Sequence, residues 1–276
     1  MTAKSFNLHL VSDSTGETIL SVARACVVQF GDFEAKKYLW PMVRGTAALD
    51  EALTAIESMP GPVLFTLVDD GLRAHLVTAC GRLGVPCIPL LDQVMGALAN
   101  YLGAKRESKP GRQHAMDAEY FARIEAMQYV LAHDDGQGSR ALDDADVILV
   151  GVSRTSKTPT CVYLANRGIK AANVPLIAGL EPPAELLACR RPLIVGLTTD
   201  AQRLIQVRRN RLRAMNEADS GPYVDIDSVT QELRMARQLC ARHGWPVLDV
   251  TRRSIEETAA AVLQLLKRRE PGAVAS

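Results

Sequence analysis

The chain has 276 residues, of which 47% are hydrophobic, so it is long enough for two domains with sizeable cores. Its 32 basic and 31 acidic residues nearly cancel, and the net charge of +1 gives no overall field that favours nucleic acid or a membrane surface. No apolar run is long enough to cross a bilayer, and the first residues lack the apolar core of a signal peptide. These observations predict a cytoplasmic protein.

The six cysteines are scattered along the chain without a C-x-x-C pair, and the five histidines show no metal-ligand spacing such as H-E-x-x-H. In a chain without a recognisable secretion signal, this pattern is typical of reduced, mostly buried thiols. We therefore expect neither a disulfide framework nor a zinc cluster.

The first part of the chain, residues 1–108, alternates strand patterns with helical patterns. Strands are expected at 6–11, 37–43, 63–68 and 85–90, and helices at 19–27, 47–58, 72–83 and 92–102. Strands that alternate with helices of this length require parallel crossovers, which predicts a doubly wound parallel-sheet α/β domain. Ligands of such sheets bind at the carboxyl ends of the strands.

Two polar loops of this domain fall at such strand ends. The first, SDSTGET, places Asp13, Ser14 and Thr15 before a helix, and the second begins with Asp69 and Asp70. Side chains of these types cap helices, so well-capped helix starts are the plainer interpretation. The alternative for SDSTGET is a ligand or catalytic loop in which Asp13, Ser14 and Thr15 contact phosphate or a target.

Residues 109–139 are expected to form a connector and a helix between the two domains. The segment AKRESKPGRQH has four basic residues and a Pro-Gly turn, which is typical of an exposed connector. Its charges either keep the segment in solvent or, at Lys109 and Arg112, contact phosphate.

A helical pattern over 116–131 ends in the sequence HDDG. His133 lies there beside the carboxylates of Asp134 and Asp135, an arrangement suited to acid/base chemistry. A histidine at the C-terminus of a helix is equally well explained as a cap that complements the helix dipole. Both interpretations stay open at this point.

The second domain, residues 140–276, is organised around the stretch DVILVGVSRTSKTPTCVYLA. Val147 to Val150 predicts a buried strand, and a helix opens near Thr158. Between them, GVSRTSKT matches the phosphate-loop pattern G-x-x-x-x-G-K-[ST] except at the second glycine, which Ser156 replaces. The expected nucleotide-binding residues are Gly151, Val152, Ser153, Arg154, Thr155, Ser156, Lys157 and Thr158.

The residue types of this loop suit phosphate chemistry. Successive backbone N–H groups and the N-terminus of the following helix would cradle an anion. Lys157 would reach the terminal phosphates, and Thr158 would offer its hydroxyl to a phosphate-bound Mg²⁺. Ser156 is the departure, because glycine there permits positive φ or close approach to phosphate. An ordinary strand-to-helix turn with a surface lysine is the alternative, but the flanking strand and helix favour the nucleotide interpretation.

The rest of this domain continues the alternation of strands and helices. Strands are expected at 174–178, 192–197 and 245–250, and helices at 201–213, 223–241 and 255–266. The helix 201–213 carries clustered arginines, including Arg208 and Arg211, which either form a solvated face or clamp a transferring phosphate. The pattern as a whole predicts a C-terminal P-loop kinase-like α/β domain.

Several motifs in fixed order resemble the pyruvate, phosphate dikinase regulatory proteins. They are SDSTGET, KPGRQH, the YFARIEA helix ending in HDDG, GVSRTSKTPT with VYLANRGIKAANVPL, and GLTTD followed by RLIQVRRNRL. The resemblance covers nearly the whole chain. That family consists of bifunctional serine/threonine kinases and phosphorylases.

The resemblance implies a pair of reactions on one protein substrate. ADP, not ATP, would phosphorylate an active-site threonine of pyruvate, phosphate dikinase and so inactivate it when the neighbouring catalytic histidine is phosphorylated. In the reverse reaction, inorganic phosphate would attack the phosphothreonine and release pyrophosphate. Gly151 to Thr158 would be the ADP loop, with Mg²⁺ as the expected metal.

Roles for other residues follow from setting this chemistry beside the motifs. Asp134, Asp135 or His133 would accept the threonine proton. Lys109, Arg112 and the SDSTGET loop are candidates for binding phosphate or pyrophosphate.

Other functions remain as alternatives. The same chemistry on phosphoenolpyruvate synthase is one, although SDSTGET and TSKTP favour the dikinase-directed group. A small-molecule P-loop kinase would explain the loop and the arginine helix but would leave the first domain without a task. In a non-catalytic ADP sensor, HDDG would be only a helix cap. The sequence leaves the oligomeric state open, with a homodimer as one assembly considered.

Overall fold

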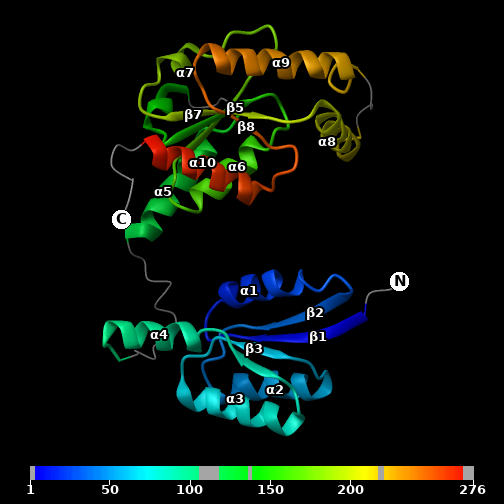
Figure 1. Cartoon of the computed structure of the whole chain (residues 1–276), viewed down its shortest axis with the longest axis vertical. Helices are drawn as coiled ribbons and strands as arrows, with labels where there is room; N and C mark the ends of the chain where they lie inside the picture. Colours follow the sequence, from blue (N-terminus) through cyan, green and yellow to red (C-terminus); the bar gives the residue numbers. More distant parts are fainter. Residues whose placement is uncertain (1–3, 106–117, 136–138, 217–220, 270–276) are drawn as a thin grey trace. The chain divides into compact units, whose positions relative to one another are not determined.

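Two parallel four-stranded sheets form the frame of the chain (Figure 1). The structure, a computed structural model, describes residues 4–105, 118–135, 139–216 and 221–269. These residues fall into two units, Met1–Ala115 and Met116–Ser276, each with its own sheet. The predicted α/β class, with a doubly wound parallel sheet at the N-terminus, is confirmed.

The first unit alternates four strands with four helices in the order expected. They are β1 (Lys4–Val11), α1 (Glu17–Val27), β2 (Phe33–Trp40), α2 (Thr46–Ser58), β3 (Val63–Phe65), α3 (Asp70–Leu83), β4 (Cys87–Pro89) and α4 (Asp92–Leu102). The strand order is β2-β1-β3-β4, and every pair is parallel. The order reverses direction between β1 and β3, which is where ligands of such sheets bind.

Helices cover both faces of this sheet because alternate residues of the central strand point to opposite sides. Leu8 and Leu10 of β1 pack in a cluster with α1, whereas Val11 packs in a cluster with α2 and α3. In Figure 1, α1 accordingly lies on one side of the strands and α2 and α3 lie on the other. The polar loops after β1 and β3 are therefore held on a packed scaffold.

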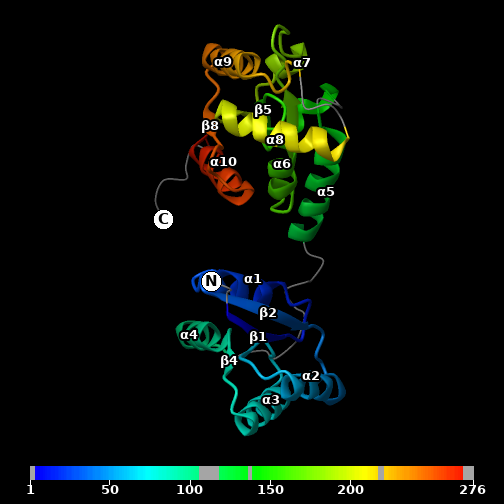
Figure 2. The same ribbon diagram turned by 90° about the vertical axis from the view of Figure 1, so that its right-hand side faces the viewer.

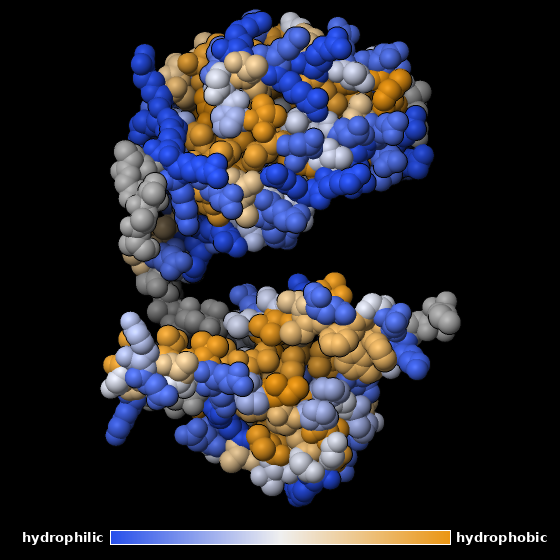
Figure 3. Space-filling model, in the orientation of Figure 1, coloured by the Kyte–Doolittle hydropathy of each residue, from blue (hydrophilic) through white to orange (hydrophobic). Residues whose placement is uncertain are grey.

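The fourth helix of the first unit packs differently. No residue of α4 is fully buried, and Val94, Leu98 and Tyr101 are each more than half exposed. On the face of this unit that Figure 3 shows, apolar residues are interspersed with hydrophilic ones. The helix therefore contributes less to the core than α1, α2 and α3 do.

The second unit begins with a helix that lies in the range expected for the connector. Its elements are α5 (Ala118–Ala132), the 3₁₀ helix η2 (Ser139–Asp144), β5 (Val147–Gly151), α6 (Lys157–Ala165), β6 (Ala171–Pro175), α7 (Ala184–Ala188), β7 (Leu193–Thr198), α8 (Ala201–Ala214), α9 (Ile226–Arg242), β8 (Val247–Asp249) and α10 (Ile255–Arg269). The strand order is β6-β5-β7-β8, again parallel throughout.

Both faces of the second sheet are also covered, as its nearly continuous apolar strands require. One core cluster joins Val147 and Leu149 of β5 to α5, α6 and α10, and the other joins Ile148 and Val150 to α7 and α9. The helix α8 packs with α9 in a further cluster next to the loop that follows β5 (Figure 2). The carboxyl ends of all four strands lie at one edge because the strands are parallel.

Two predicted strand positions are wrong by several residues. The strand expected at 37–43 is β2, which runs from Phe33 to Trp40 and pairs with the whole length of β1. It is an edge strand that is largely exposed, so its sequence lacks the apolar alternation on which the prediction depended. The strand expected at 174–178 is β6, Ala171–Pro175, whose small residues Ala171 and Ala172 carry little strand signal.

Among the helices of the described ranges, none combines the length and the apolar character that a membrane crossing demands.

Gly196 in the middle of β7 offers a test of the packing between the sheet and α9. A Cβ at this position would lie 2.6 Å from Sγ of Cys240 and 3.3 Å from Cγ2 of Val247. We expect Gly196→Ala to lower the free energy of unfolding by about 1–3 kcal/mol, because the Cys240 side chain is buried in the core and would have to shift. Thermal unfolding of the full chain measures this.

The matched control is Gly96→Ala in α4, where nothing lies within 4 Å of the added methyl group. It is expected to raise stability by up to about 1 kcal/mol through helix propensity. An unchanged melting temperature for Gly196→Ala would contradict the packing described.

Candidate functional site

The loop between β5 and α6 has the shape that its sequence predicts. The strand β5 is buried along its whole length and ends at Gly151. A Cβ on Gly151 would lie 2.5 Å from the carbonyl oxygen of Leu197 in β7, so no larger residue fits without a shift of the backbone. Arg154 and Ser156 both adopt left-handed backbone conformations, with φ of 72° and 62°. The left-handed φ at Ser156 explains why the loop pattern has glycine at this place.

Serine at position 156 does not hold the loop through its hydroxyl in the way a helix cap would. Ser156 is the residue before α6, and its side chain makes no capping hydrogen bond. The loop is instead held by its neighbours. The hydroxyl of Thr155 donates to the carbonyl oxygen of Val152 at 3.0 Å. The hydroxyl of Thr160 donates to the backbone carbonyl oxygen of Ser156 at 2.7 Å.

Lys157 is the first residue of α6 and is buried, with 5% of its surface exposed. Its ammonium group donates to the carbonyl oxygen of Val152 at 2.9 Å. Burial lowers the pKa of Lys157 from its ordinary 10.5 to about 8, and the carboxylates of Asp135 and Asp134 partly oppose this shift. Lys157 is therefore a hydrogen-bond donor at this site whose protonation would respond to the binding of an anion.

A cavity of about 290 Å³ opens beside this loop. It is lined by Asp135, Ser153, Arg154, Ser156, Lys157, Thr158, Pro159, Asn173, Pro175 and Val207. Five of these residues belong to the predicted range 151–158, and Asp135 belongs to the predicted HDDG turn. The sequence interpretation therefore located most of the cavity wall, with side chains from α6, β6 and α8 completing it.

Four side chains from three separate segments converge at the edge of this cavity. Nδ2 of Asn173 lies 2.7 Å from Oδ1 of Asp134, 3.1 Å from Oδ1 of Asp135 and 2.9 Å from Oγ1 of Thr158. The Thr158 hydroxyl in turn donates to Oδ1 of Asp134 at 2.9 Å. The structure thus brings together Asp134, Asp135 and Thr158, which the sequence suggested independently.

Asn173 was missed from the sequence. It lies in β6, paired in register with Leu149 of β5, and only 1% of its surface is exposed. An asparagine with its side chain buried in a short, otherwise apolar strand was the available signal, because a buried amide needs polar partners.

His133 makes contacts of the helix-capping type. Its Nδ1 lies 2.9 Å from the carbonyl oxygen of Tyr129 one turn earlier, and its ring stacks on the Tyr129 ring at a centroid distance of 3.9 Å. Nδ1 must carry the proton in this contact, which leaves Nε2 as an acceptor, buried and without a hydrogen-bond partner. The imidazole is not among the described side chains that line the cavity.

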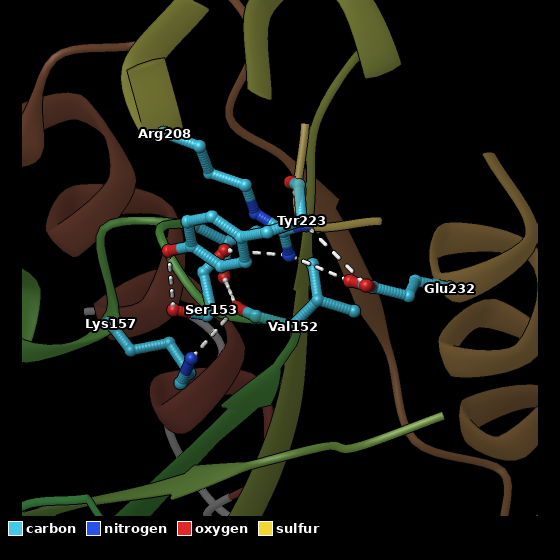
Figure 4. Close-up of polar contacts among 7 residues, drawn as sticks. Val152, Ser153, Lys157, Arg208, Tyr223 and Glu232 are labelled. Atoms are coloured by element: carbon cyan, nitrogen blue, oxygen red, sulfur yellow. Dashed lines mark hydrogen bonds and ion pairs between the residues drawn. The ribbon is translucent and has the colours of Figure 1, made fainter. Parts of the chain in front are cut away.

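Arg208 supports the β5–α6 loop from the side of α8 (Figure 4). Only 1% of it is exposed, and its guanidinium lies 4.3 Å from the centre of the Tyr223 ring. It donates to a carboxylate oxygen of Glu232 at 2.6 Å and to the carbonyl oxygens of Tyr223 at 2.9 Å and Ser153 at 3.4 Å. The guanidinium therefore links α8 and α9 to the loop, whereas Arg211 is exposed on α8.

The candidates of the first unit lie at the end of β1 and are largely buried. Oδ2 of Asp13 accepts from the backbone N–H of Val68 at 2.8 Å, which ties the loop after β1 to the loop after β3. Ser14 is 5% exposed, and its hydroxyl has no hydrogen-bond partner. Thr15 is exposed.

Of the remaining candidates of the first half, the structure describes Asp69 but not Lys109 and Arg112. Asp69 caps α3 by accepting from the N–H of Leu72 at 2.8 Å, as the plainer interpretation expected. Lys109 and Arg112 lie outside the residues that the structure describes.

The ion pair between Arg208 and Glu232 generates a prediction. Replacing Glu232→Gln leaves a buried guanidinium without its countercharge, so we expect a loss of about 2–4 kcal/mol in the free energy of unfolding. Denaturant unfolding measures it. Asp144→Asn removes a carboxylate from the pair with Arg191, whose side chains are 67% and 72% exposed, and should change stability by less than about 0.5 kcal/mol. Equal effects of the two changes would refute the supporting role of Arg208.

Comparison with known proteins finds one matching family model and many proteins of similar sequence. The family model described as "Kinase/pyrophosphorylase" matches residues 8–263. A protein of Caulobacter vibrioides named "Putative pyruvate, phosphate dikinase regulatory protein" is 55% identical over 95% of this chain and 83% of its own length. A protein of Sphingopyxis alaskensis with the same name is 52% identical over 95% of this chain and 97% of its own length.

Solved structures add little to this. A mitochondrial ornithine carbamoyltransferase from Coccidioides immitis aligns with 93% of this chain and 75% of its own, at 11% identity and a TM-score of 0.25, a likeness that carries no argument. The sequence matches, by contrast, cover nearly the whole chain and confirm the resemblance seen in its motifs. The chain belongs to the kinase/pyrophosphorylase family.

Proposed function

We propose that the chain is a cytoplasmic, bifunctional regulator of pyruvate, phosphate dikinase. In one direction it transfers the β-phosphoryl group of ADP to a threonine of the dikinase, and in the other it moves that group to inorganic phosphate. The observation that carries the proposal is a buried lysine at a helix N-terminus, beside two carboxylates and a cavity. The names of the relatives support the dikinase as the target.

The β5–α6 loop is the proposed site for the phosphates of ADP. The N-terminus of α6 carries unpaired N–H groups and the positive end of the helix dipole, and Lys157 adds a full charge. The cavity of about 290 Å³ is at the lower end of the roughly 300–1,000 Å³ typical of small-molecule sites, so it suits the phosphate end of a nucleotide. Mg²⁺, as the proposed metal, would supply neutralisation of phosphate charge, with the Thr158 hydroxyl as a ligand.

The forward reaction balances without a further reactant. The threonine oxygen forms a bond to the β-phosphorus of ADP, the bond from that phosphorus to the bridging oxygen breaks, and AMP leaves. The proton of the threonine hydroxyl passes to Asp134, Asp135 or His133. Asp135 is the best supported acceptor because it lines the cavity and is exposed to an incoming substrate.

The reverse reaction uses inorganic phosphate as the nucleophile. One of its oxygens attacks the phosphorus of the phosphothreonine, the threonine oxygen leaves and regains a proton, and pyrophosphate is released. For further contacts with phosphate or the target we keep Asp13, Ser14, Thr15, Lys109, Arg112 and Arg211, whereas the buried Arg208 would act only by positioning the β5–α6 loop. Among these candidates, the loop after β1 is favoured by the hydroxyl of Ser14, which is buried and has no hydrogen-bond partner.

The depressed pKa of Lys157 makes ADP binding dependent on pH. In the free protein the lysine loses its proton as pH rises through about 8, whereas the bound phosphates stabilise the ammonium form. Binding at pH 9 should therefore take up a proton, and binding at pH 7 should take up little. Calorimetric titration with ADP in two buffers of different ionisation enthalpy measures this uptake.

Lys157→Arg is the matched control, since a guanidinium keeps its proton throughout this range. It should show no uptake attributable to this side chain at pH 9. If wild type and Lys157→Arg take up equal amounts of proton at pH 9, Lys157 does not contact the phosphates.

The central experiment uses ADP labelled at the β-phosphorus. The full chain is mixed with purified pyruvate, phosphate dikinase and phosphoenolpyruvate, which forms the phosphohistidine. We expect label on a threonine of the dikinase together with AMP, and label in pyrophosphate once inorganic phosphate is added. Lys157→Ala should lower transfer by at least about 100-fold, as loss of a principal electrostatic contact does.

Parallel reactions with ATP and with phosphoenolpyruvate synthase separate the alternatives. Labelling of the synthase alone would move the target to that enzyme. Turnover of ATP without any protein substrate would indicate a small-molecule kinase, and ADP binding without transfer to either protein would indicate a sensor.

A further inference from the structure

The turn that follows α5 has a backbone conformation that few side chains adopt. Asp135 is exposed at its end and has a φ of 50°, in the left-handed region. The residue before it, Asp134, is partly buried. An exposed carboxylate on such a turn keeps one direction only if other residues hold it. The contacts of the turn therefore decide what the Asp135 carboxylate can do.

One residue, Asn173, contacts all three residues of this turn. Its backbone N–H donates to the carbonyl oxygen of His133 at 3.1 Å. Its side-chain Nδ2 lies 2.7 Å from Oδ1 of Asp134 and 3.1 Å from Oδ1 of Asp135. Asn173 is itself fixed, because it pairs in register with Leu149 of β5 and only 1% of its surface is exposed. The sheet thus sets the position of the turn through this one residue.

The side-chain amide of Asn173 acts here as a hydrogen-bond donor. Its Nδ2 also lies 2.9 Å from Oγ1 of Thr158, so its two hydrogens are shared among three oxygens. The reversed amide would place the oxygen of Asn173 against two carboxylates, so the contacts decide which atom faces them. That oxygen is buried without a hydrogen-bond partner among the described residues, which costs stability. A side chain kept only for packing would not need this cost, so the N–H groups are the reason for the amide.

The two carboxylates of the turn have different surroundings. Oδ1 of Asp134 accepts from both Thr158 and Asn173, and Asp134 is not among the described residues that line the cavity. Asp135 does line the cavity, and its contact with Asn173 at Oδ1 leaves Oδ2 for a substrate proton. Asn173 lines the cavity too, but its amide hydrogens are already engaged. It can therefore act through Asp135 and not on the substrate directly.

We propose that Asn173 is a positioning residue for phosphoryl transfer, and that its amide holds the Asp135 carboxylate where that group accepts the proton of the target hydroxyl. This inference rests on the proposed function. As the hydroxyl oxygen bonds to the β-phosphorus of ADP, its O–H bond breaks and the proton passes to Oδ2 of Asp135. A carboxylate misplaced by about 1 Å costs about 100-fold in rate. ADP affinity is kept, because Lys157 and the N-terminus of α6 bind the phosphates.

Asn173→Leu tests the proposal, since leucine nearly matches the shape of asparagine and cannot donate a hydrogen bond. We expect transfer of the β-phosphoryl group from ADP to the dikinase, followed in a single turnover, to slow by about 10–100-fold. The dissociation constant of ADP should stay within about threefold of wild type. Asn173→Ala, which adds no bulk to the core, should show the same split if the leucine variant does not fold.

The matched control is Asn166→Leu, which makes the same chemical change at an exposed position at the C-terminus of α6. Its transfer rate should equal that of wild type, because Asn166 is not among the described residues that line the cavity.

A double-mutant cycle with Asp135→Asn shows whether Asn173 acts through that carboxylate. Asp135→Asn alone should slow transfer by about 100-fold or more, which is the usual contribution of a general base. Adding Asn173→Leu to it should slow transfer by less than about threefold further, because two residues that act as one unit give non-additive losses.

Slower transfer with ADP affinity kept, together with non-additive losses in the cycle, supports the positioning role. An unchanged rate for Asn173→Leu, losses that multiply in the double variant, or ADP binding that weakens as much as transfer does would each overturn it. In all three cases the proposed function still stands. Absence of transfer by the wild-type chain would refute the proposed function itself, and this inference with it.

Discussion

The buried charge of Lys157 is the constraint around which the second unit is arranged. An ammonium group taken out of water must be paired or lose its proton, and here burial already lowers its pKa to about 8. Its partners are the carbonyl oxygen of Val152 and, at longer range, Asp135 and Asp134. The left-handed conformation at Ser156 and the close approach of Gly151 to β7 both serve to bring the lysine and the helix N-terminus to the same place.

The sheet order decides what surrounds that lysine. Because β6 pairs with β5, Asn173 is carried next to the start of α6, and its backbone N–H donates to the carbonyl oxygen of His133 at 3.1 Å. That contact anchors the turn that holds Asp134 and Asp135. On the opposite side, Arg208 fixes the loop through Ser153 and is itself held by Glu232. The site is thus supported from α5, β6, α8 and α9, which are far apart in the sequence.

The sequence was sufficient for features that depend on local chemistry. The buried strand, the loop and the helix at 147–165 follow from the residue pattern alone. So does the expectation of a positive φ at Ser156, where the loop pattern has glycine. The HDDG turn was found as a candidate, but its contact with Thr158 was not, because that contact depends on which strands pair. Asn173 was missed for the same reason. The burial of Arg208 was also missed, since clustered arginines on a helix resemble a solvated face until the partner Glu232 is placed beside one of them.

The errors in the predicted positions of two strands also have physical causes. The start of β2 and the position of β6 are set by pairing with β1 and β5, and neither segment has an apolar pattern strong enough to locate it alone. The alternation of strands and helices was nevertheless strong enough to establish both parallel sheets.

The most direct test of the central claim is a crystal structure of the full chain with ADP and Mn²⁺, in which anomalous scattering locates the metal. The account predicts the β-phosphate within hydrogen-bond distance of Nζ of Lys157, which has left the carbonyl oxygen of Val152. It also predicts Mn²⁺ beside that phosphate, with the Thr158 hydroxyl as a ligand. A nucleotide bound away from the β5–α6 loop, with Lys157 still bonded to Val152, would contradict it.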